Sequence, residues 1–405
     1  MNIVIAGFGV AGATAAETAR KQNPRAYITL FSKEKDLFYY RPRLPEVVSG
    51  ELAPDKVFVH PASWYEERNI ELRLGESLIE INTQAKIIRG STGSRQTYDK
   101  LLLAVGAESN RPQFPGDKLD GIYAVRSLHD AWSLSSFAKG KKKAVLIGGG
   151  LLGLELGYAL TRQGLEVTVL ERDDRILPRQ TTPKSAELLR RKLAKLGIEF
   201  RLQAQADRFE GSRQVDNVLL KDGQDLPADI VLISAGVVPN LNLATTLELK
   251  MDRAIVVDEY LRTSAPDIYA AGDCAQFPGA VGGLWTTSRA QGLVAGVNIA
   301  VTDQAEMKTY IPEPPASTLK VAGVDLVAVG NLDPDGQLTS AEASTESTYR
   351  KVVIDAEGRL AGFTNVGTTK GNRELQKALA EKKIIDQPTL ESLASPDFDF
   401  AKLSS

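Results

Sequence analysis

Cysteine and histidine are nearly absent from the 405-residue chain, which holds one cysteine, Cys274, and two histidines, His60 and His129. One thiol cannot close a disulfide bond within the chain, so a disulfide-stapled secreted fold is excluded and a reducing compartment is indicated. With so few Cys and His side chains no zinc-ligand set can form, and no metal site is expected. A G-x-S-x-G nucleophile turn is also lacking, which argues against hydrolysis.

The chain also lacks a dominant charge. Lys plus Arg total 49 and Asp plus Glu total 51, giving a formal charge of -2, so no global field gathers nucleic acid or anionic lipid, and neither is expected as a partner. No uncharged apolar run approaches the roughly 18 residues of a membrane span. The apolar amino terminus has no basic leader and is interrupted by glycines, so it is interpreted as structure rather than as a signal peptide. A cytoplasmic protein of two or three domains is expected.

Glycine-rich loops are what the sequence does contain. A strand-like run, Ile3–Ala6, leads into GFGVAG with Gly7, Gly9 and Gly12, and an alanine-rich helix follows through Arg20. In a dinucleotide-binding loop the first glycine allows a tight turn, the second lets the backbone approach a pyrophosphate, and the third lets the helix pack on the strand. The amino terminus of the helix then faces the phosphates.

The same arrangement occurs a second time. A strand at Ala144–Ile147 is followed by Gly148, Gly150 and Gly153 and by a helix through Thr161. A single G-x-G-x-x-G pattern is weak evidence, since a flexible loop also explains it. Two copies, each between a predicted strand and a predicted helix, predict two dinucleotide-binding units.

Each unit should end its second strand near a group that holds the adenosine ribose. In the second unit Glu171 lies at the end of EVTVLE, 18 residues after the last loop glycine, where its charge would repel a 2'-phosphate and favour NAD over NADP. The neighbouring Arg172 and Arg175 weaken that inference. In the first unit the segment YITLFSKEKD offers Ser32, Lys33 and Glu34 as candidate ribose ligands, and an exposed strand end is the alternative interpretation there.

Three further predicted strands end in small residues, at 98–107 (YDKLLLAVGA), 228–240 (ADIVLISAGVVPN) and 268–273 (IYAAGD). Small residues at the carboxyl edge of a sheet leave room for a ligand, and cofactors of open α/β sheets lie at that edge. Ordinary turn chemistry would explain each one taken alone.

Taken in order, GFGVAG, YRPRL at 40–44, YDKLLLAVGA, GGGLLGLE, SAGVVPN, TSAPDIYAAGD and WTTSRAQG resemble the FAD/NAD-dependent pyridine nucleotide-disulfide oxidoreductase-like family, and within it the NADH:rubredoxin and ferredoxin reductases. The resemblance covers about residues 1 to 300 and weakly the remainder. It implies an α/β fold of the glutathione-reductase type, with two Rossmann-like dinucleotide-binding domains and a small α+β C-terminal domain. The implied domains are 1–112 with 245–308 for FAD, 113–244 for NAD, and 309–405 as a cap or interface domain.

The resemblance and the two loops together assign candidate residues to each cofactor. Asp273 would bond the ribityl chain of FAD, and the backbone at Leu78 would meet its adenine. A solvated surface position is the alternative for the two arginines of the FAD set. The FAD set comprises Gly7, Gly9, Ala11, Gly12, Ser32, Glu34, Arg41, Pro42, Leu78, Ala104, Val105, Gly106, Arg126, Gly272, Asp273, and Trp285 and Thr286 beside the isoalloxazine. The NAD set comprises Gly148, Gly149, Gly150, Leu151, Leu152, Gly153, Glu155, Glu171 and Gly236.

The sequence departs from the family pattern in two places. The usual A-T-G reads Ala-Val-Gly at 104–106, which removes a hydroxyl but keeps the small turn. Many ferredoxin-reductase-like members have an acidic residue in place of Lys33 and a lysine in place of Glu46, so both charges are reversed here. Arg43 could restore a positive charge beside Glu155 or Glu46, near the flavin. No residue is expected to be essential for acid or base catalysis.

Cys274 is interpreted as a bystander. Disulfide reductases of this architecture carry redox cysteines in the segment that here reads RPRLPEVV, which has none. Cys274 instead follows Asp273 among small residues, where a cysteine packs as a small hydrophobe. Without a thiol relay, electrons would leave directly from FAD.

The C-terminal part begins after the proline-rich linker PEPPAS, 312–317. Short strands are expected within 319–330 and 349–367, the latter forming a hairpin with its turn at AEGR, and a helix is expected at 372–383. This pattern predicts a small α+β domain that closes the flavin site or forms an interface, with no catalytic residue of its own.

Three functions are compatible with these features. The leading one is an FAD-dependent NADH:acceptor oxidoreductase that passes single electrons to an iron-sulfur protein such as rubredoxin or ferredoxin. The second is an NAD-linked FAD subunit of a larger complex, of the 2-oxoacid or aldehyde oxidoreductase type, which reduces NAD+ and docks on iron-sulfur subunits through the C-terminal segment that runs to DFDFAKLSS, 397–405. The third is a flavoprotein that binds NADH to change its conformation and partner.

Overall fold

The computed structural model of the protein describes residues 1–280, 282–321, 323–333 and 335–403. Residue 322 of the expected strand region and residues 404 and 405 of the expected docking segment lie outside this description. The described chain separates into two compact units. Unit 1 comprises Met1–Leu44, Ala53–Glu108 and Val237–Glu313, and unit 2 comprises Pro45–Leu52, Ser109–Gly236 and the chain from Pro314 on. The finer division into three domains stays a prediction.

Unit 1 is built on a parallel sheet with the strand order β19-β7-β1-β2-β3. The central strand β1 has side chains that are at most 1% exposed from Ile3 to Ala6, as expected for a strand covered on both faces. This confirms the predicted strand before the first glycine loop. The strands span Asn2–Ala6 (β1), Tyr27–Ser32 (β2), Ile70–Leu74 (β3), Lys100–Leu103 (β7) and Ile268–Ala270 (β19).

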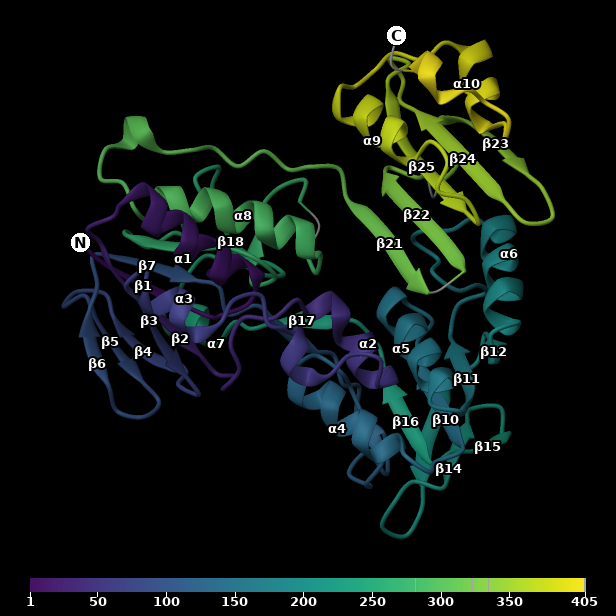
Figure 1. Ribbon diagram of the computed structural model, residues 1–405, viewed down its shortest axis with the longest axis horizontal. Helices are drawn as coiled ribbons and strands as arrows, with labels where there is room; N and C mark the ends of the chain where they lie inside the picture. Colours follow the sequence, from purple (N-terminus) through teal and green to yellow (C-terminus); the bar gives the residue numbers. More distant parts are fainter. Residues whose placement is uncertain (281, 322, 334, 404–405) are drawn as a thin grey trace. The chain divides into compact units, whose positions relative to one another are not determined.

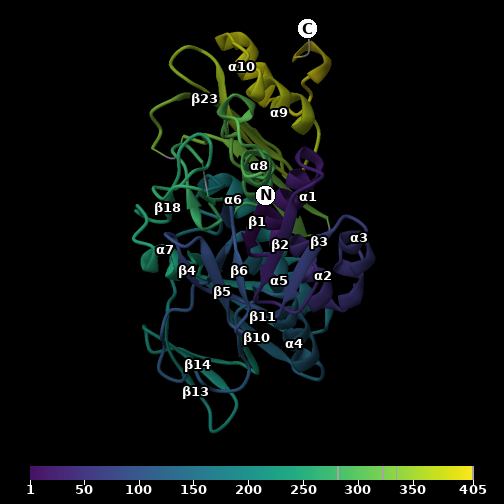
Figure 2. The same ribbon diagram turned by 90° about the vertical axis from the view of Figure 1, so that its left-hand side faces the viewer.

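Two helices of unit 1 pack closely against each other, α1 (Val10–Gln22) and α8 (Trp285–Asn298). They lie side by side in both views of the chain (Figure 1, Figure 2). A Cβ atom at Gly292 of α8 would lie 2.5 Å from the carbonyl oxygen of Ala11, and one at Gly296 would lie 2.7 Å from that of Ala15. Glycine at these positions therefore lets the two backbones approach, and the helix that follows the first loop is fixed by a segment of chain far away in sequence.

Shorter elements complete unit 1. They are η2 (Pro54–Val57), α3 (Ala62–Glu66), β4 (Leu78–Asn82), β5 (Ile87–Gly90), β6 (Arg95–Thr97), β8 (Ala107–Ser109), β17 (Val237–Pro239), α7 (Asn242–Thr246), β18 (Ile255–Val256), β20 (Ala275–Gln276), η1 (Arg41–Arg43) and η3 (Gln304–Glu306). Strand β8 extends one residue past the boundary of unit 1, and α2 (Leu44–Ser49) begins one residue before unit 2.

Unit 2 contains a second parallel sheet, with the order β12-β11-β10-β16-β9. Its strand β10 precedes the second glycine loop and pairs with β11, which ends at Glu171. The sheet, its helices and a small antiparallel sheet comprise β9 (Ile122–Tyr123), α4 (Leu128–Ala138), β10 (Lys143–Ile147), α5 (Leu151–Arg162), β11 (Glu166–Glu171), α6 (Pro183–Ala194), β12 (Ile198–Leu202), β13 (Ala206–Glu210), β14 (Asn217–Leu220), β15 (Asp225–Pro227) and β16 (Ile230–Ile233). The two Rossmann-like units of the predicted fold class are thus confirmed.

The C-terminal part of unit 2 is an antiparallel sheet with the order β21-β22-β25-β24-β23 and helices packed on it. The predicted hairpin is present, because the amide of Asp355 donates to the carbonyl of Arg359 between β24 and β25. The elements are β21 (Ala316–Val321), β22 (Val324–Gly330), β23 (Thr339–Ser344), β24 (Tyr349–Ile354), β25 (Leu360–Val366), α9 (Asn372–Ala380), α10 (Gln387–Ala394) and η4 (Phe400–Leu403). Helix α9 follows the predicted position but ends earlier.

The docking role expected of segment 397–405 stays a prediction, but two of its apolar side chains are buried. Phe400 is 6% exposed and Leu403 is 5% exposed, and both belong to the core that α9, α10 and the C-terminal sheet share. Lys383 also donates to the carbonyl oxygen of Leu403 at 2.5 Å. Phe400 and Leu403 therefore serve the hydrophobic core of the C-terminal part of unit 2.

Candidate functional site

The first glycine loop has two glycines that the fold requires and one that it does not. A Cβ atom at Gly7 would lie 2.1 Å from the carbonyl oxygen of Ala104, and one at Gly12 would lie 1.9 Å from that of Gly7. Gly9 differs, because a Cβ there would meet no heavy atom within 4 Å. Its φ of -76° and ψ of -173° are also open to any residue. The missing side chain at Gly9 therefore leaves space for a ligand at the amino terminus of α1.

The second loop repeats this division. A Cβ atom at Gly148 would lie 2.4 Å from the carbonyl oxygen of Ser234, and one at Gly153 would lie 2.6 Å from that of Gly148. At Gly150, where φ is -78° and ψ is 172°, it would meet no heavy atom within 4 Å. Neither Gly9 nor Gly150 offers a side chain to cap its helix. Both helix amino termini are thus suited to phosphate groups, as FAD and NAD require.

Glu171 joins the end of β11 to the second loop. It is 7% exposed, and its Oε2 accepts a hydrogen bond from the amide of Gly149 at 2.8 Å while Oε1 accepts one from Asp173 at 3.0 Å. The carboxylate is therefore fixed beside the loop by two backbone N–H groups. This is the place that the sequence predicts for the ribose ligand.

The two arginines near Glu171, Arg172 and Arg175, differ in how strongly they are bound by other groups of the protein. Arg175 donates to Asp174 at 2.7 Å and to the carbonyl of Pro178 at 3.4 Å. The side chain of Arg172 is 76% exposed and lies 3.9 Å from the carboxylate of Asp173. Arg172 is thus the more available of the two to a 2'-phosphate.

In the first unit the end of β2 is occupied by an ion pair. Glu34 accepts hydrogen bonds from Arg41 at 2.9 Å and from the hydroxyl of Tyr39 at 2.6 Å, and Ser32 donates to the carbonyl oxygen of Glu34 at 2.9 Å. Burial opposes the charge of Arg41, but Tyr39, Glu34 and Asp273 outweigh it, so the pKa of the guanidinium is raised. The sequence analysis singled out Glu34 and Arg41 separately. It did not predict that they form an ion pair, or that the hydroxyl of Tyr39 donates to Glu34.

Lys33 has a local partner. Its Nζ lies 3.0 Å from Oε1 of Glu108, and the two side chains are 78% and 62% exposed. An exposed pair of this kind contributes about 0–1 kcal/mol. The positive charge of Lys33, which replaces the acidic residue of many family members, is therefore paired within unit 1 with the carboxylate of Glu108. The sequence pattern did not single out Glu108.

The turn after β19 is held by helix α8. Oδ1 of Asp273 accepts hydrogen bonds from Ser288 at 3.0 Å and from the amide of Gly283 at 3.2 Å. The amide of Gly272, where φ is 82°, donates to Oε1 of Gln291 at 2.7 Å. Two polar residues of α8, Ser288 and Gln291, thus orient the turn that carries Asp273. Ser288 and Gln291 are three residues apart, which places them on the same face of α8, and this spacing is visible in the sequence.

An aromatic cluster surrounds the start of α8. The ring of Trp285 stacks on Phe38 with centroids 5.9 Å apart and planes 11° apart, and Tyr40 meets it edge-on at 4.8 Å. Phe38 in turn lies 6.1 Å from Phe8 of the first loop. The cluster brings Trp285 and the loop to one region of unit 1, while Thr286 is exposed.

The Ala-Val-Gly turn after β7 is fixed by a residue from a distant segment. The side-chain amide of Asn240 donates to the carbonyl of Val105 at 2.8 Å, and its backbone amide donates to that of Gly106 at 2.9 Å. Ala104 is 5% exposed, and its amide donates to the carbonyl oxygen of Ala6 at the end of β1. Asn240 is the last residue of the motif SAGVVPN, so the sequence analysis noted this residue. The sequence did not reveal that it bonds to the Ala-Val-Gly turn.

The remaining predicted residues divide between the units. Leu78 begins β4 and is 7% exposed, and its neighbour across the sheet is Gly90. Arg126 and Glu155 belong to unit 2, whereas Arg43 belongs to unit 1. The predicted approach of Arg126 to FAD and of Arg43 to Glu155 or Glu46 therefore stays a prediction.

Cys274 is fully buried, with its thiol directed at the carbonyl oxygens of Leu103 and Ala271 at 3.4 Å and 3.5 Å. Burial raises the pKa of the thiol to about 11. Since the thiolate is the nucleophile in disulfide exchange, this cysteine is held in its unreactive form, as expected for a bystander.

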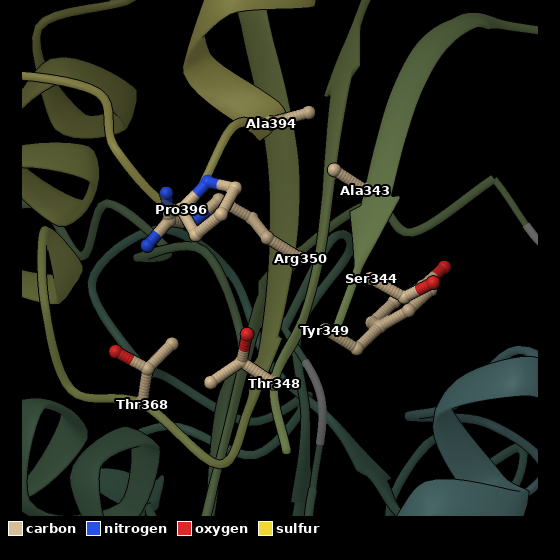
Figure 3. Close-up of a pocket in the computed structure, with 8 residues that line it drawn as sticks. All are labelled: Ala343, Ser344, Thr348, Tyr349, Arg350, Thr368, Ala394 and Pro396. Carbon is tan, nitrogen blue, oxygen red and sulfur yellow. The ribbon is translucent and has the colours of Figure 1, made fainter. Parts of the chain in front are cut away.

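A small cavity in the C-terminal part of unit 2 does not serve as a nucleotide site. It measures about 30 Å³ and is lined by Arg350, Tyr349, Thr368 and neighbours (Figure 3), which is room for water rather than for a cofactor. Arg350 is 3% exposed and donates to Asn365 and to the carbonyls of Leu393, Ser395 and Lys370. Its guanidinium thus ties the end of α10 to the sheet.

These features define an α/β protein with two dinucleotide-type loops and a separate C-terminal sheet. Comparison with known families shows that the chain belongs to the pyridine nucleotide-disulphide oxidoreductases, whose family pattern matches residues 1–292. Residues 315–383 match the rubredoxin NAD+ reductase C-terminal domain. Membership in this family implies FAD and a pyridine nucleotide as cofactors, and the open glycines Gly9 and Gly150 fit both.

Individual relatives agree with this assignment. The chain is 32% identical over 98% of its length to an assimilatory nitrate reductase electron transfer subunit of Bacillus subtilis, but spans about half, 53%, of that protein. It is 32% identical over 91% of its length to a rubredoxin-NAD(+) reductase of Ectopseudomonas oleovorans and spans 97% of it. The crystal structure of a ferredoxin reductase from Rhodopseudomonas palustris superposes with a TM-score of 0.90 at 27% identity, over 100% of both chains. No helix among the described residues is long and apolar enough to span a membrane.

Proposed function

We propose that the protein is an FAD-dependent NADH:acceptor oxidoreductase that passes single electrons to an iron-sulfur protein of the rubredoxin or ferredoxin type. FAD supplies hydride acceptance and one-electron release when it is bound. The observation that carries the proposal is the pair of open glycines, Gly9 and Gly150, in one chain whose sole thiol is buried. Relatives named rubredoxin and ferredoxin reductases support the class of acceptor.

The residues of unit 1 would bind FAD without taking part in proton transfer. The amino terminus of α1 would face the pyrophosphate beside Gly9, and Asp273 would accept from the ribityl hydroxyls. Arg41, fixed by Glu34, would add positive charge near the anionic part of the cofactor. Trp285, stacked on Phe38, would limit access of water to the ring system.

The residues of unit 2 would bind NADH in preference to NADPH. Glu171 is buried and charged beside the loop, so it would accept from the ribose hydroxyls and repel a 2'-phosphate. Arg175 is engaged by Asp174, which leaves Arg172 as the more available of these two arginines for a phosphate. We infer that Glu171 outweighs Arg172, because the carboxylate is fixed and the exposed arginine is not.

A second candidate function is that of an electron-transfer subunit or domain in a larger oxidoreductase. The observation that favours it is that one relative is much longer than this chain. The alignment with a nitrate reductase electron transfer subunit covers 98% of this chain but only about half of that subunit. Co-purification of the protein from its native host with iron-sulfur or other redox subunits would support this role, and isolation as an active, single-chain reductase would favour the first.

The decisive experiment is anaerobic reduction followed by mixing with acceptors. The purified protein should show flavin absorbance, lose it on addition of NADH, and recover it faster with oxidised rubredoxin or ferredoxin than with air. A disulfide such as oxidised glutathione serves as the two-electron control and should react slowly, since Cys274 cannot relay electrons. Rapid turnover with the disulfide and none with any iron-sulfur protein would refute the proposal.

A further inference from the structure

A chain of hydrogen bonds connects the C-terminal sheet with the start of α6, both within unit 2. Tyr349 is 1% exposed, and its hydroxyl donates to Oε2 of Glu342 at 2.6 Å while accepting from Oγ1 of Thr182 at 2.9 Å. Lys184 donates to the other oxygen of Glu342 at 2.6 Å. Lys184 and Tyr349 hold the pKa of Glu342 below its usual range, so the carboxylate stays charged at neutral pH and anchors the chain.

Thr182 is also the last residue of a segment that reaches back to the second glycine loop. We call residues 176–182 the brace. At its start the amide of Leu177 donates to the carbonyl oxygen of Gly149 at 3.2 Å. In its middle the hydroxyl of Thr181, which is 8% exposed, donates to the carbonyls of Ile176 and Leu177, both at 2.9 Å. The brace is therefore bonded to itself and to the loop.

The brace holds one residue in an unfavourable backbone conformation. Leu177 has a φ of 50°, in the left-handed region that residues with a Cβ atom avoid, and it is 1% exposed. Such a conformation persists where the surrounding contacts determine it fully. The contacts here are Gly149 at one end and, at the other, Thr182 at the amino-terminal cap of α6, where its hydroxyl accepts from the amide of Ser185.

Further contacts tie the same parts together. The hydroxyl of Thr364 in β25 donates to the carbonyl of Gln180 at 3.4 Å. Helix α6 packs on β22, β24 and β25, and α5, which begins at the second loop, packs on β21. The C-terminal sheet thus supports both helices that flank the predicted nucleotide site.

We propose that Tyr349 is a positioning residue for the pyridine nucleotide: it fixes Thr182, Thr182 fixes the brace, and the brace fixes the carbonyl of Gly149. This inference rests on the proposed function, because it requires a nucleotide at the second loop. Glu171 fixes the amide of the same glycine from the other side, so the peptide groups on both sides of Gly149 have set directions before the pyrophosphate arrives. Preorganisation of this kind raises affinity by lowering the ordering cost of binding.

The test measures NAD+ binding to the FAD-loaded enzyme by isothermal titration calorimetry. Tyr349→Phe removes the hydroxyl and keeps the ring, and we expect it to raise the Kd for NAD+ about fivefold, the factor that corresponds to the net worth of one hydrogen bond. Thr182→Val should weaken binding in the same direction, whereas Thr182→Ser keeps the hydroxyl and should restore it. In steady-state assays the KM for NADH should rise with Tyr349→Phe while kcat stays within about twofold of the unaltered enzyme.

Leu390→Ala is the matched control for loss of domain stability. Leu390 is fully buried in α10, within a core cluster that includes no residue of the brace, and it makes no hydrogen bond of the chain, so its truncation should destabilise the same sheet while leaving those hydrogen bonds their donors and acceptors. We expect a lower melting temperature and an unchanged Kd for NAD+. All variants are compared well below their melting temperatures and at equal FAD content.

The outcomes separate the two proposals. An enzyme that binds NAD+ equally well with and without the Tyr349 hydroxyl overturns the positioning role and leaves the proposed function intact. Equal weakening by Leu390→Ala also overturns it, because general loosening of the domain would then explain the effect. If the unaltered enzyme binds no pyridine nucleotide, the proposed function and this inference fail together.

Discussion

Arg41 donates to Oε1 of Glu34 at 2.9 Å, and the pair occupies the position where the first nucleotide unit is expected to bind a ribose. With Tyr39 on the other oxygen of Glu34, the carboxylate acts here as an anchor for the arginine. The positive charge near the FAD loop is thus held by Glu34, both of whose carboxylate oxygens already accept a hydrogen bond from the protein.

Glu34→Gln is predicted to weaken FAD binding. The substitution removes the charge that holds Arg41, and a charge-assisted hydrogen bond contributes about 1.5–3 kcal/mol, so we expect FAD affinity to fall by about tenfold or more. Fluorescence titration of apoprotein with FAD gives the Kd. Lys33→Met is the control, because Lys33 belongs to the exposed pair with Glu108, and it should leave the Kd unchanged. An equal loss in both variants would point to general surface charge instead.

Substitutions of different glycines in the two loops are predicted to have different effects, some on folding stability and others on cofactor binding. Gly12→Ala places a Cβ atom 1.9 Å from the carbonyl oxygen of Gly7, so we expect destabilisation of about 1–3 kcal/mol or more. Gly9→Ala should leave the melting temperature of the apoprotein unchanged and reduce FAD content. Gly150→Ala should keep FAD and lose NADH reactivity. Thermal melts, absorbance and NADH titrations distinguish the three, and loss of stability in Gly9→Ala would show that its space is needed by the protein.

Glu171 is predicted to set the preference for NADH. Glu171→Gln keeps an oxygen acceptor and removes the charge, so the ratio of kcat/KM for NADH to that for NADPH should fall by about tenfold. Arg172→Met tests the opposing cation and should leave NADH turnover intact while reducing any activity with NADPH. If the unaltered enzyme uses both nucleotides equally, Arg172 rather than Glu171 controls the choice.

Cys274→Ser is predicted to leave FAD content and NADH oxidation nearly unchanged. Because burial raises the pKa of the thiol to about 11, only about one thiol in ten thousand is ionised at pH 7. The native protein should therefore resist alkylation by iodoacetamide at pH 7 and react readily once it is unfolded. Loss of turnover with FAD retained would give Cys274 a role that its burial argues against.

The two loops could be predicted from the sequence because their determinants are local. Gly7, Gly9 and Gly12 lie within six residues, between a strand and a helix of clear composition, and the turn at AEGR is likewise set by neighbouring residues. Glu171 was proposed as the ribose ligand from its distance along the chain, and the structure places its carboxylate beside the second loop, where it accepts from the amide of Gly149.

Other features depend on contacts that leave no periodic pattern. Asn240 fixes the turn at Val105 across 135 residues, and Tyr349 meets Thr182 across 167 residues. Composition and periodicity carry no information on such pairs, because any asparagine or tyrosine in a loop or strand looks the same in sequence. The burial of Phe400 and Leu403 in the C-terminal core likewise went unpredicted, since Phe400 packs on partners that sequence alone does not identify.

The sheet of unit 1 has a consequence for synthesis on the ribosome. Its strand β7 pairs with β19 through Leu101 and Ile268, so the partner of β7 emerges 167 positions later. At the usual rate of about 5–20 residues per second, the nascent chain waits roughly 8 to 33 s with an apolar strand edge unpaired. Unit 1 therefore cannot complete its sheet while the Ser109–Gly236 part of unit 2 is being translated, and this interval is when the chain is most exposed to aggregation and most in need of a chaperone that shields strand edges.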